Sequence, residues 1–163
     1  MSEKIALYTL YIRKKHLFCT RKSKNSLEII YNQQDMAKRK FNLEYNLDAV
    51  SGPILWNAIG TPTGLQTWMA DNVDVNENIY TFEWDQSEIR QAELTHRRVN
   101  SHMRFHWLDD EDPKSFFEIR MENNELTGDY TLLITDFAEE DEVEDLTELW
   151  NIEVNQLIRL CGM

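Results

Sequence analysis

Alternating apolar and polar residues predict antiparallel strands over most of the chain between residues 41 and 134. Residues 41–47 place Phe41, Leu43, Tyr45 and Leu47 on one face and polar side chains on the other. This period of two is typical of a half-buried strand. The same rule predicts further strands at residues 79–84, 88–94, 99–107, 117–121 and 130–134.

A segment of different character, residues 51–71, interrupts these strands. It predicts two short helices joined by a Gly-Thr-Pro turn. Ser51 and Thr61 are expected to cap the two helices, because each precedes a proline that fits a first helical turn. Each helix is expected to present a tryptophan, Trp56 or Trp68, to the interior.

After residue 138 the apolar period changes to that of a helix near residues 142–160. Apolar residues recur there at steps of three and four, with either Glu153 or Val154 on the inward face, and Gly162 follows as a stop signal. The acidic cluster at residues 139–145 suits the positive end of the helix dipole. The predicted fold class is α+β: a curved antiparallel sheet of six or seven strands wrapped around this long C-terminal helix.

The charge distribution divides the chain at Met36. Residues 1–35 carry a balance of +4 within a total of −12, so the remainder carries −16. Residues 1–35 also lack sustained periodicity. They are expected to be a flexible extension or the product of a start codon placed before the true one at Met36, and to be dispensable for folding. Residues 36–163 are predicted to form one domain.

Composition excludes several classes of protein. A strongly acidic body repels phosphate backbones, which disfavours nucleic-acid binding. No apolar run approaches the ~20 residues that span a bilayer. Cys19 and Cys161 lie near opposite ends without CxxC spacing, which favours a reducing compartment, so we expect a cytoplasmic protein.

Several short motifs together resemble one superfamily. They are residues 40–45 (KFNLEY), 60–65 (GTPTGL), 68–71 (WMAD), 105–110 (FHWLDD), 117–120 (FEIR), 125–128 (ELTG) and 134–139 (ITDFAE). With the order of elements, they make residues 36–163 similar to the START-like, or SRPBCC, superfamily with its helix-grip fold. The resemblance is strongest to small bacterial START-like domains related to the activator of the ninety-kilodalton heat-shock ATPase. Met69, where a phenylalanine is usual, and Asn155 depart from the pattern.

This resemblance implies a hydrophobic cavity between the sheet and the final helix, without a catalytic set of residues. The candidate ligand-cavity residues are Tyr45, Trp68, Tyr80, Phe82, Trp84, Phe105, Trp107, Phe117, Leu132, Trp150 and Val154. Two interpretations stay open, because an inward aromatic stripe can form a filled core as well as line a pocket.

Other polar residues have simpler interpretations. His102 and His106 share an outward face with Arg104, which indicates a surface row and not a metal site. The acidic residues 109–112 lack the glycine and the spacing of a calcium loop and are expected to form a solvated turn. Asp136 and Glu139 are explained by helix capping. The predicted inward face contains no ionisable group beyond tyrosine, so we predict no catalytic residue, no metal site and no cofactor.

Three functions are compatible with these observations. The first is a non-enzymatic domain that buries a small hydrophobic molecule, with Tyr45 and Tyr80 orienting it. The second is a protein-interaction module of the heat-shock-ATPase-activator type. The third is a cyclase-like or hydrolase-like enzyme.

Overall fold

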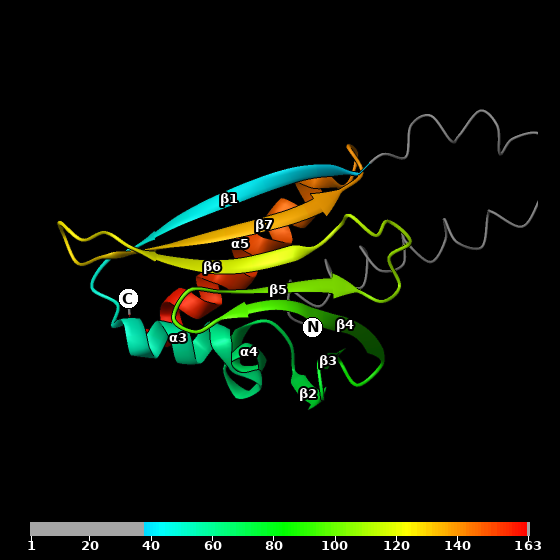
Figure 1. Ribbon diagram of the computed structural model, residues 1–163, viewed down its shortest axis with the longest axis horizontal. Coiled ribbons are helices and arrows are strands. Elements are labelled where there is room, and N and C mark those ends of the chain that lie inside the picture. The colour runs from blue at the N-terminus through cyan, green and yellow to red at the C-terminus, as the bar shows by residue number, and fades with distance from the viewer. Residues whose placement is uncertain (1–37, 163) are drawn as a thin grey trace, which may run out of the picture.

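A computed structural model describes residues 38–162, so the expectations about residues 1–35 lie outside the described residues. A seven-stranded antiparallel sheet curves around one long helix (Figure 1). The elements are β1 (Arg39–Leu47), α3 (Gly52–Gly60), α4 (Pro62–Trp68), β2 (Asn72–Asn76), β3 (Ile79–Trp84), β4 (Glu88–Arg98), β5 (His102–Trp107), β6 (Phe117–Asn123), β7 (Tyr130–Ala138) and α5 (Val143–Leu160).

The predicted α+β architecture is confirmed. The strands follow the order β1-β7-β6-β5-β4-β3-β2, so only the pairing of β1 with β7 joins strands distant in sequence. Helix α5 crosses the concave side of the sheet, and α3 and α4 lie along the same side (Figure 1). Trp150 of α5 is buried at 4% exposure, as the helical period predicted. No helix among residues 38–162 is long and apolar enough to cross a membrane.

The strand limits differ from the prediction in two places. β2 was not foreseen, because this edge strand is short and mostly polar, with Val73 its one buried residue. β4 continues to Arg98, past an irregularity in register between Leu94 and His96, and residues 99–101 form the turn to β5. A bulge of this kind interrupts the period-two signal and hides the end of the strand.

The two short helices meet as the sequence indicated, with two corrections. The Thr61 hydroxyl caps α4 by accepting a hydrogen bond from the Gly64 N–H at 2.9 Å, but Ser51 makes no such bond to α3. Trp68 is fully buried and donates its indole N–H to the Ala58 carbonyl at 3.0 Å. Trp56 is only partly buried, because it lies at the edge of the core beneath the Arg97 guanidinium.

Gly64 allows α3 and α4 to approach each other. A Cβ at this position would lie 2.0 Å from the Asn57 carbonyl oxygen and 2.6 Å from the Ala58 carbonyl oxygen. Both neighbours are backbone atoms, which cannot turn away as a side chain can. The second glycine of the Gly-Thr-Pro-Thr-Gly segment is therefore required by packing and not by its φ angle.

We predict that Gly64→Ala lowers the free energy of unfolding by ~3 kcal/mol or more, the upper end of the usual cost of overpacking, measured by urea denaturation. Gly128→Ala is the matched control, since Gly128 has open space around it and a φ of +79°. That variant should lose only ~1–2 kcal/mol from backbone strain. Equal or smaller destabilisation by Gly64→Ala would contradict the close approach of the two helices.

Candidate functional site

The predicted cavity residues form a packed aromatic cluster between the sheet and α5. The ring centroids of Phe105 and Phe117 lie 4.9 Å apart, and those of Trp107 and Phe117 lie 4.8 Å apart. Tyr80 contacts Phe105 at 5.0 Å, and Trp150 approaches Phe117 at 6.1 Å. Aromatic rings in direct contact have centroid separations of roughly 4.5–7 Å. The central space of the fold is therefore filled by the rings themselves.

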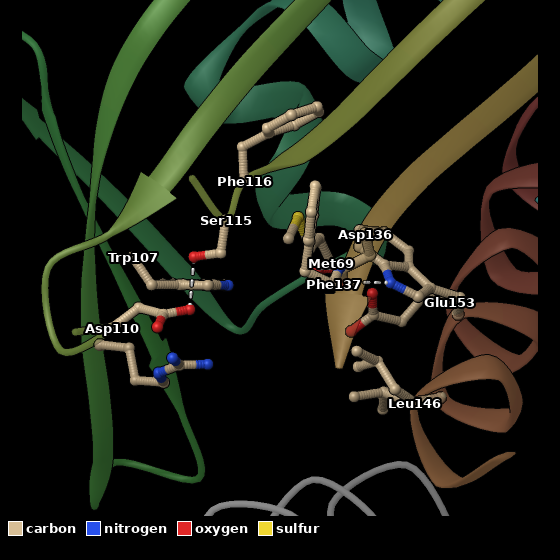
Figure 2. A pocket seen from close by; sticks show the side chains of 12 residues that line it. Met69, Trp107, Asp110, Ser115, Phe116, Asp136, Phe137, Leu146 and Glu153 are labelled. Carbon is tan, nitrogen blue, oxygen red and sulfur yellow. Dashed lines mark hydrogen bonds between the residues drawn. The ribbon is translucent and has the colours of Figure 1, made fainter. Parts of the chain in front are cut away.

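A pocket remains at one side of this cluster, where β6 begins at Phe117 while β5 and β7 continue beyond it. It is bounded by the loop between β5 and β6, the end of β7 and the first half of α5 (Figure 2). Its volume is about 30 Å³, which is room for about two water molecules. The lining residues are Met69, Arg90, Trp107, Asp110, Ser115, Phe116, Asp136, Phe137, Leu146, Leu149, Trp150 and Glu153.

Asp136 and Trp150 join the sheet to the helix at this pocket. The Trp150 indole N–H donates to Asp136 Oδ2 at 2.8 Å, and the Phe137 backbone N–H donates to Oδ1 at 2.7 Å. Asp136 is only 6% exposed. The expectation that Asp136 caps the final helix was wrong, because its carboxylate faces inward along β7 and accepts the indole proton.

Arg90 forms the opposite wall. Its guanidinium lies 4.0 Å from the ring centroid of Trp107 and donates two hydrogen bonds to Asp109, from Nε at 3.0 Å and Nη2 at 2.7 Å. The Asp109 side chain is 54% exposed, whereas that of Arg90 is 6% exposed. This bidentate pair therefore attaches the outer part of the β5–β6 loop to a buried residue of β4.

Asp110 anchors the same loop from inside. Its carboxylate pairs with Lys38 and accepts hydrogen bonds from the Ser115 hydroxyl at 2.6 Å and the Asp112 N–H at 3.1 Å. Burial alone would raise the pKa of Asp110, but these donors and the Lys38 charge bring the pKa below its ordinary value. Only part of the acidic turn is solvated, because the Asp110 side chain is 6% exposed in this network.

Glu153 lies on the inward face of α5 and is 2% exposed. Figure 2 shows its side chain extending from the helix toward the pocket, on the same side as Asp136. Tyr45, whose hydroxyl donates to Asn151 at 2.7 Å, is within reach of the Glu153 charge. Burial, and then the Glu153 charge, raise the pKa of Tyr45 to about 12.

The pocket and the predicted cavity overlap only in Trp107 and Trp150. Trp68, Phe82, Phe105, Phe117, Leu132 and Val154 are fully buried, and Tyr80 and Trp84 are nearly so. Tyr45 is half-buried at the edge of the sheet.

The expectation of an inward face without ionisable groups was wrong, since Arg90, Asp136 and Glu153 all line the pocket. A signal for each was present in the sequence. Arg90 shares strand parity with Ala92, Asp136 shares it with Ile134, and Glu153 falls on the apolar stripe of α5.

The histidine row lies on the outer face of the sheet, but His102 is buried there and does not belong to a surface row. The rings of His96 and His102 stack with centroids 5.1 Å apart, and burial lowers the pKa of His102. Glu118 accepts hydrogen bonds from Arg104 at 2.8 Å and from Arg120 at 2.9 Å. On the same outer face, the Arg104 guanidinium also lies over the ring of Phe116, a residue that lines the pocket.

An open antiparallel sheet around a C-terminal helix, with a pocket between them, defines a class of helix-grip domains. A family model described as a START-like superfamily domain matches residues 36–163, and this chain belongs to that superfamily. The resemblance noted from the sequence motifs is thereby confirmed.

Solved structures agree with this assignment. A Bacteroides fragilis protein solved by NMR is 54% identical, with a TM-score of 0.57 over 78% of this chain and 94% of that one. The Aha1 dimer from Colwellia psychrerythraea is 15% identical, with a TM-score of 0.55 over 75% of this chain and 92% of that one. A Bacillus thuringiensis protein is 10% identical, with a TM-score of 0.64 over 76% and 98%. The latter two show the fold alone. No curated protein matches the sequence.

We predict that Trp150→Phe lowers the free energy of unfolding by ~1–3 kcal/mol, because it leaves a buried carboxylate oxygen without its indole donor. Trp84→Phe is the matched control: it removes an indole N–H that donates to the neutral Met69 carbonyl at 2.8 Å. Its loss should be smaller, ~0.5–1.5 kcal/mol. Denaturant unfolding measures both, and equal losses would show that the charge of Asp136 adds nothing.

The lowered pKa of Asp110 predicts a pH-dependent contribution to stability. A carboxyl whose folded pKa is depressed stabilises the fold above its unfolded pKa and loses this contribution as pH falls through the folded value. Asp110→Asn should therefore cost ~1–3 kcal/mol at pH 7, and the difference from wild type should shrink below about pH 4. Exposed Asp141→Asn should change stability by less than ~0.5 kcal/mol. A pH-independent difference for Asp110→Asn in urea unfolding would contradict the ionic anchor.

Proposed function

We propose that this protein is a non-enzymatic binding domain that holds a small molecule in the pocket beneath the first half of α5. The observation that carries the proposal is the pair of buried carboxylates, Asp136 and Glu153, facing a hollow with apolar walls. Burying ionisable groups costs free energy, so they are rare in an apolar interior. Ionisable groups retained in a pocket in this way mark candidate binding sites.

The proposed site differs from the one that the aromatic residues predicted. Two residues of the aromatic cluster, Trp107 and Trp150, line the pocket. The apolar side chains of Met69, Leu146 and Leu149 line it as well. The volume of about 30 Å³ is far below the roughly 300–1,000 Å³ of sites for drug-sized ligands. Binding a benzene-sized molecule therefore requires side chains of the α5 wall or of the β5–β6 loop to move apart.

Leu146 lies in the first turn of α5 and provides the sharpest test. Indole, a neutral aromatic probe, should bind the native protein and shift the indole N–H signal of Trp150 in NMR spectra. Leu146→Ala enlarges the pocket and should tighten binding about tenfold, because the probe refills the void. Leu146→Phe should abolish binding by filling the pocket. The control Leu55→Ala makes a void away from the pocket and should leave the Trp150 shift unchanged.

Absence of binding to both the wild type and a folded Leu146→Ala variant would overturn the proposal. Binding that Leu146→Phe leaves intact would place the probe elsewhere. With no pocket binding, the protein-interaction module becomes the better-supported function.

One observation favours this second function. Four exposed apolar side chains belong to α3, the β4–β5 turn, the β6–β7 turn and the end of α5, which Figure 1 shows at the same end of the molecule. They are Ile54, Val99, Leu126 and Leu160, exposed by 54%, 63%, 96% and 56%. Exposed apolar residues that share one end of a domain are candidates for a protein contact.

The inward ionisable groups, which were not predicted from the sequence, favour the enzyme alternative. Within the described residues, however, Asp136 is engaged by Trp150 and the Phe137 N–H, and the Ser115 hydroxyl donates to Asp110. These bonds hold the walls of the pocket together, which supports a binding function. The proposal includes a cytoplasmic location, supported by the isolated positions of the two cysteines.

A further inference from the structure

The hairpin formed by β4 and β5 differs in charge from the rest of the chain. Residues 94–108 contain three arginines and three histidines but no aspartate or glutamate, although the whole chain has 29 acidic residues and a net charge of −12. This stretch includes the turn of the hairpin at residues 99–101. A positive area on an acidic protein attracts anionic groups that the rest of the surface repels.

The antiparallel register places the basic side chains in two rows on the outer face of the sheet. One row crosses β4, β5 and β6 through Arg98, His102 and Arg120, and the adjacent row crosses the same strands through His96, Arg104 and Glu118. Neighbouring strands lie about 4.8 Å apart, so each row spans about 10 Å. These six residues therefore form one compact surface, here called the basic face.

Glu118 does not neutralise the basic face. Its side chain is 6% exposed and accepts hydrogen bonds from Arg104 Nε at 2.8 Å and from Arg120 Nε and Nη2 at 3.0 and 2.9 Å. Two guanidinium groups thus share one carboxylate, and their side chains are 38% and 30% exposed. Arg98 is exposed and forms no ion pair with another of residues 38–162. Three arginines and one carboxylate leave a formal charge of +2.

The pKa of His102 reports the sign of the field at this face. Burial lowers that pKa, and the charges of Arg120, His96 and Arg104 lower it further, whereas the charge of Glu118 raises it. The cationic neighbours therefore oppose one more positive charge between the two rows. The same field favours a negative group placed over them.

Apolar and acidic residues limit what fits on the basic face. Val99, at the turn of the hairpin, is 63% exposed, and the half-buried Leu133 of β7 lies opposite Arg120 in register. Carboxylates return at Glu122, two residues beyond Arg120 on β6, and at Glu93 on β4. Exposed charges act over about 8 Å at physiological ionic strength. The face therefore suits a short segment with a few carboxylates and some apolar side chains.

We infer that the basic face docks a short acidic segment of a partner protein, whose carboxylates contact Arg98, Arg104 and Arg120 and whose apolar side chains contact Val99. This goes beyond the proposed function, because none of these arginines lines the pocket. Guanidinium groups suit the role, since they bind carboxylates through paired hydrogen bonds and are weakly hydrated.

Two other occupants are disfavoured by charge. The backbone of a nucleic acid carries its charge along its whole length and would reach the acidic surface beyond the basic face. A second copy of this chain brings a net charge of −12 against an equal charge, so the two copies repel each other at long range.

Two capped peptides of equal length test the inference in the full isotope-labelled chain at pH 7 and low ionic strength. They are Asp-Leu-Asp-Leu-Asp and its neutral counterpart Asn-Leu-Asn-Leu-Asn. The acidic peptide should shift the backbone amide signals of residues 96–104 and 118–120 in NMR spectra. The neutral peptide should bind at least about fivefold more weakly, because it lacks the charges that the arginines attract. Added salt should weaken binding of the acidic peptide alone.

Arg98→Gln should reduce the affinity for the acidic peptide about fivefold. Its fold should be intact, because Arg98 has no ion pair to lose within residues 38–162. Lys114→Gln is the matched control, since it removes the same charge from an exposed position of the β5–β6 loop. It should leave the affinity within about twofold.

Equal binding of the two peptides, an equal effect of the two substitutions, or shifts confined to other residues would overturn the inference. Tighter binding of a single-stranded oligothymidylate would overturn it in favour of a nucleic acid. Shifts of residues 96–104 on raising the protein concentration alone would overturn it in favour of a second copy. Indole binding in the pocket is followed separately at Trp150, so failure of the basic face and failure of the proposed function are distinguishable.

Discussion

The structure depends on the hydrogen bond from Trp150 to Asp136, which connects its two layers, helix α5 and the sheet. Helix α5 rests on the concave sheet mainly through apolar contacts, which resist separation but do not by themselves set one position along the helix. A charge-assisted bond of 2.8 Å between an indole edge and a buried carboxylate is directional. It places the first half of α5 over the end of β7, and this placement creates the pocket beside it.

The aromatic cluster and the pocket result from the same geometry. Where β5, β6 and β7 run side by side, the rings of Phe105 and Phe117 stack and the space is filled. Beyond Phe117 the chain leaves the sheet for the β5–β6 loop, and the stack ends at Trp107, whose ring lines the pocket. Arg90, Asp110 and Ser115 close that end with ionic and hydrogen-bonded contacts. The interior of the domain thus has an aromatic side and a polar side.

This arrangement explains why a charged helix residue can face inward. Glu153 occupies a position where an apolar side chain would be expected from the period of α5, and it is almost fully buried. Its location at the polar end of the interior lowers the cost of burial relative to the aromatic side.

The sequence by itself determined the α+β architecture, six of the seven strands and the burial of Trp150, because periods of two and of 3.6 residues report directly which faces are buried. It also determined the Thr61 cap, a local interaction. It missed β2, whose polar edge carries little alternation, and the extension of β4, which a bulge conceals.

Only the tertiary structure decided that the aromatic stripe packs against itself while a smaller pocket forms at its edge. That outcome depends on where β6 ends relative to its neighbours and on contacts such as Arg90 with Asp109 and Trp150 with Asp136. Periodicity assigns a residue to a face, but it contains no information on the distance between two faces.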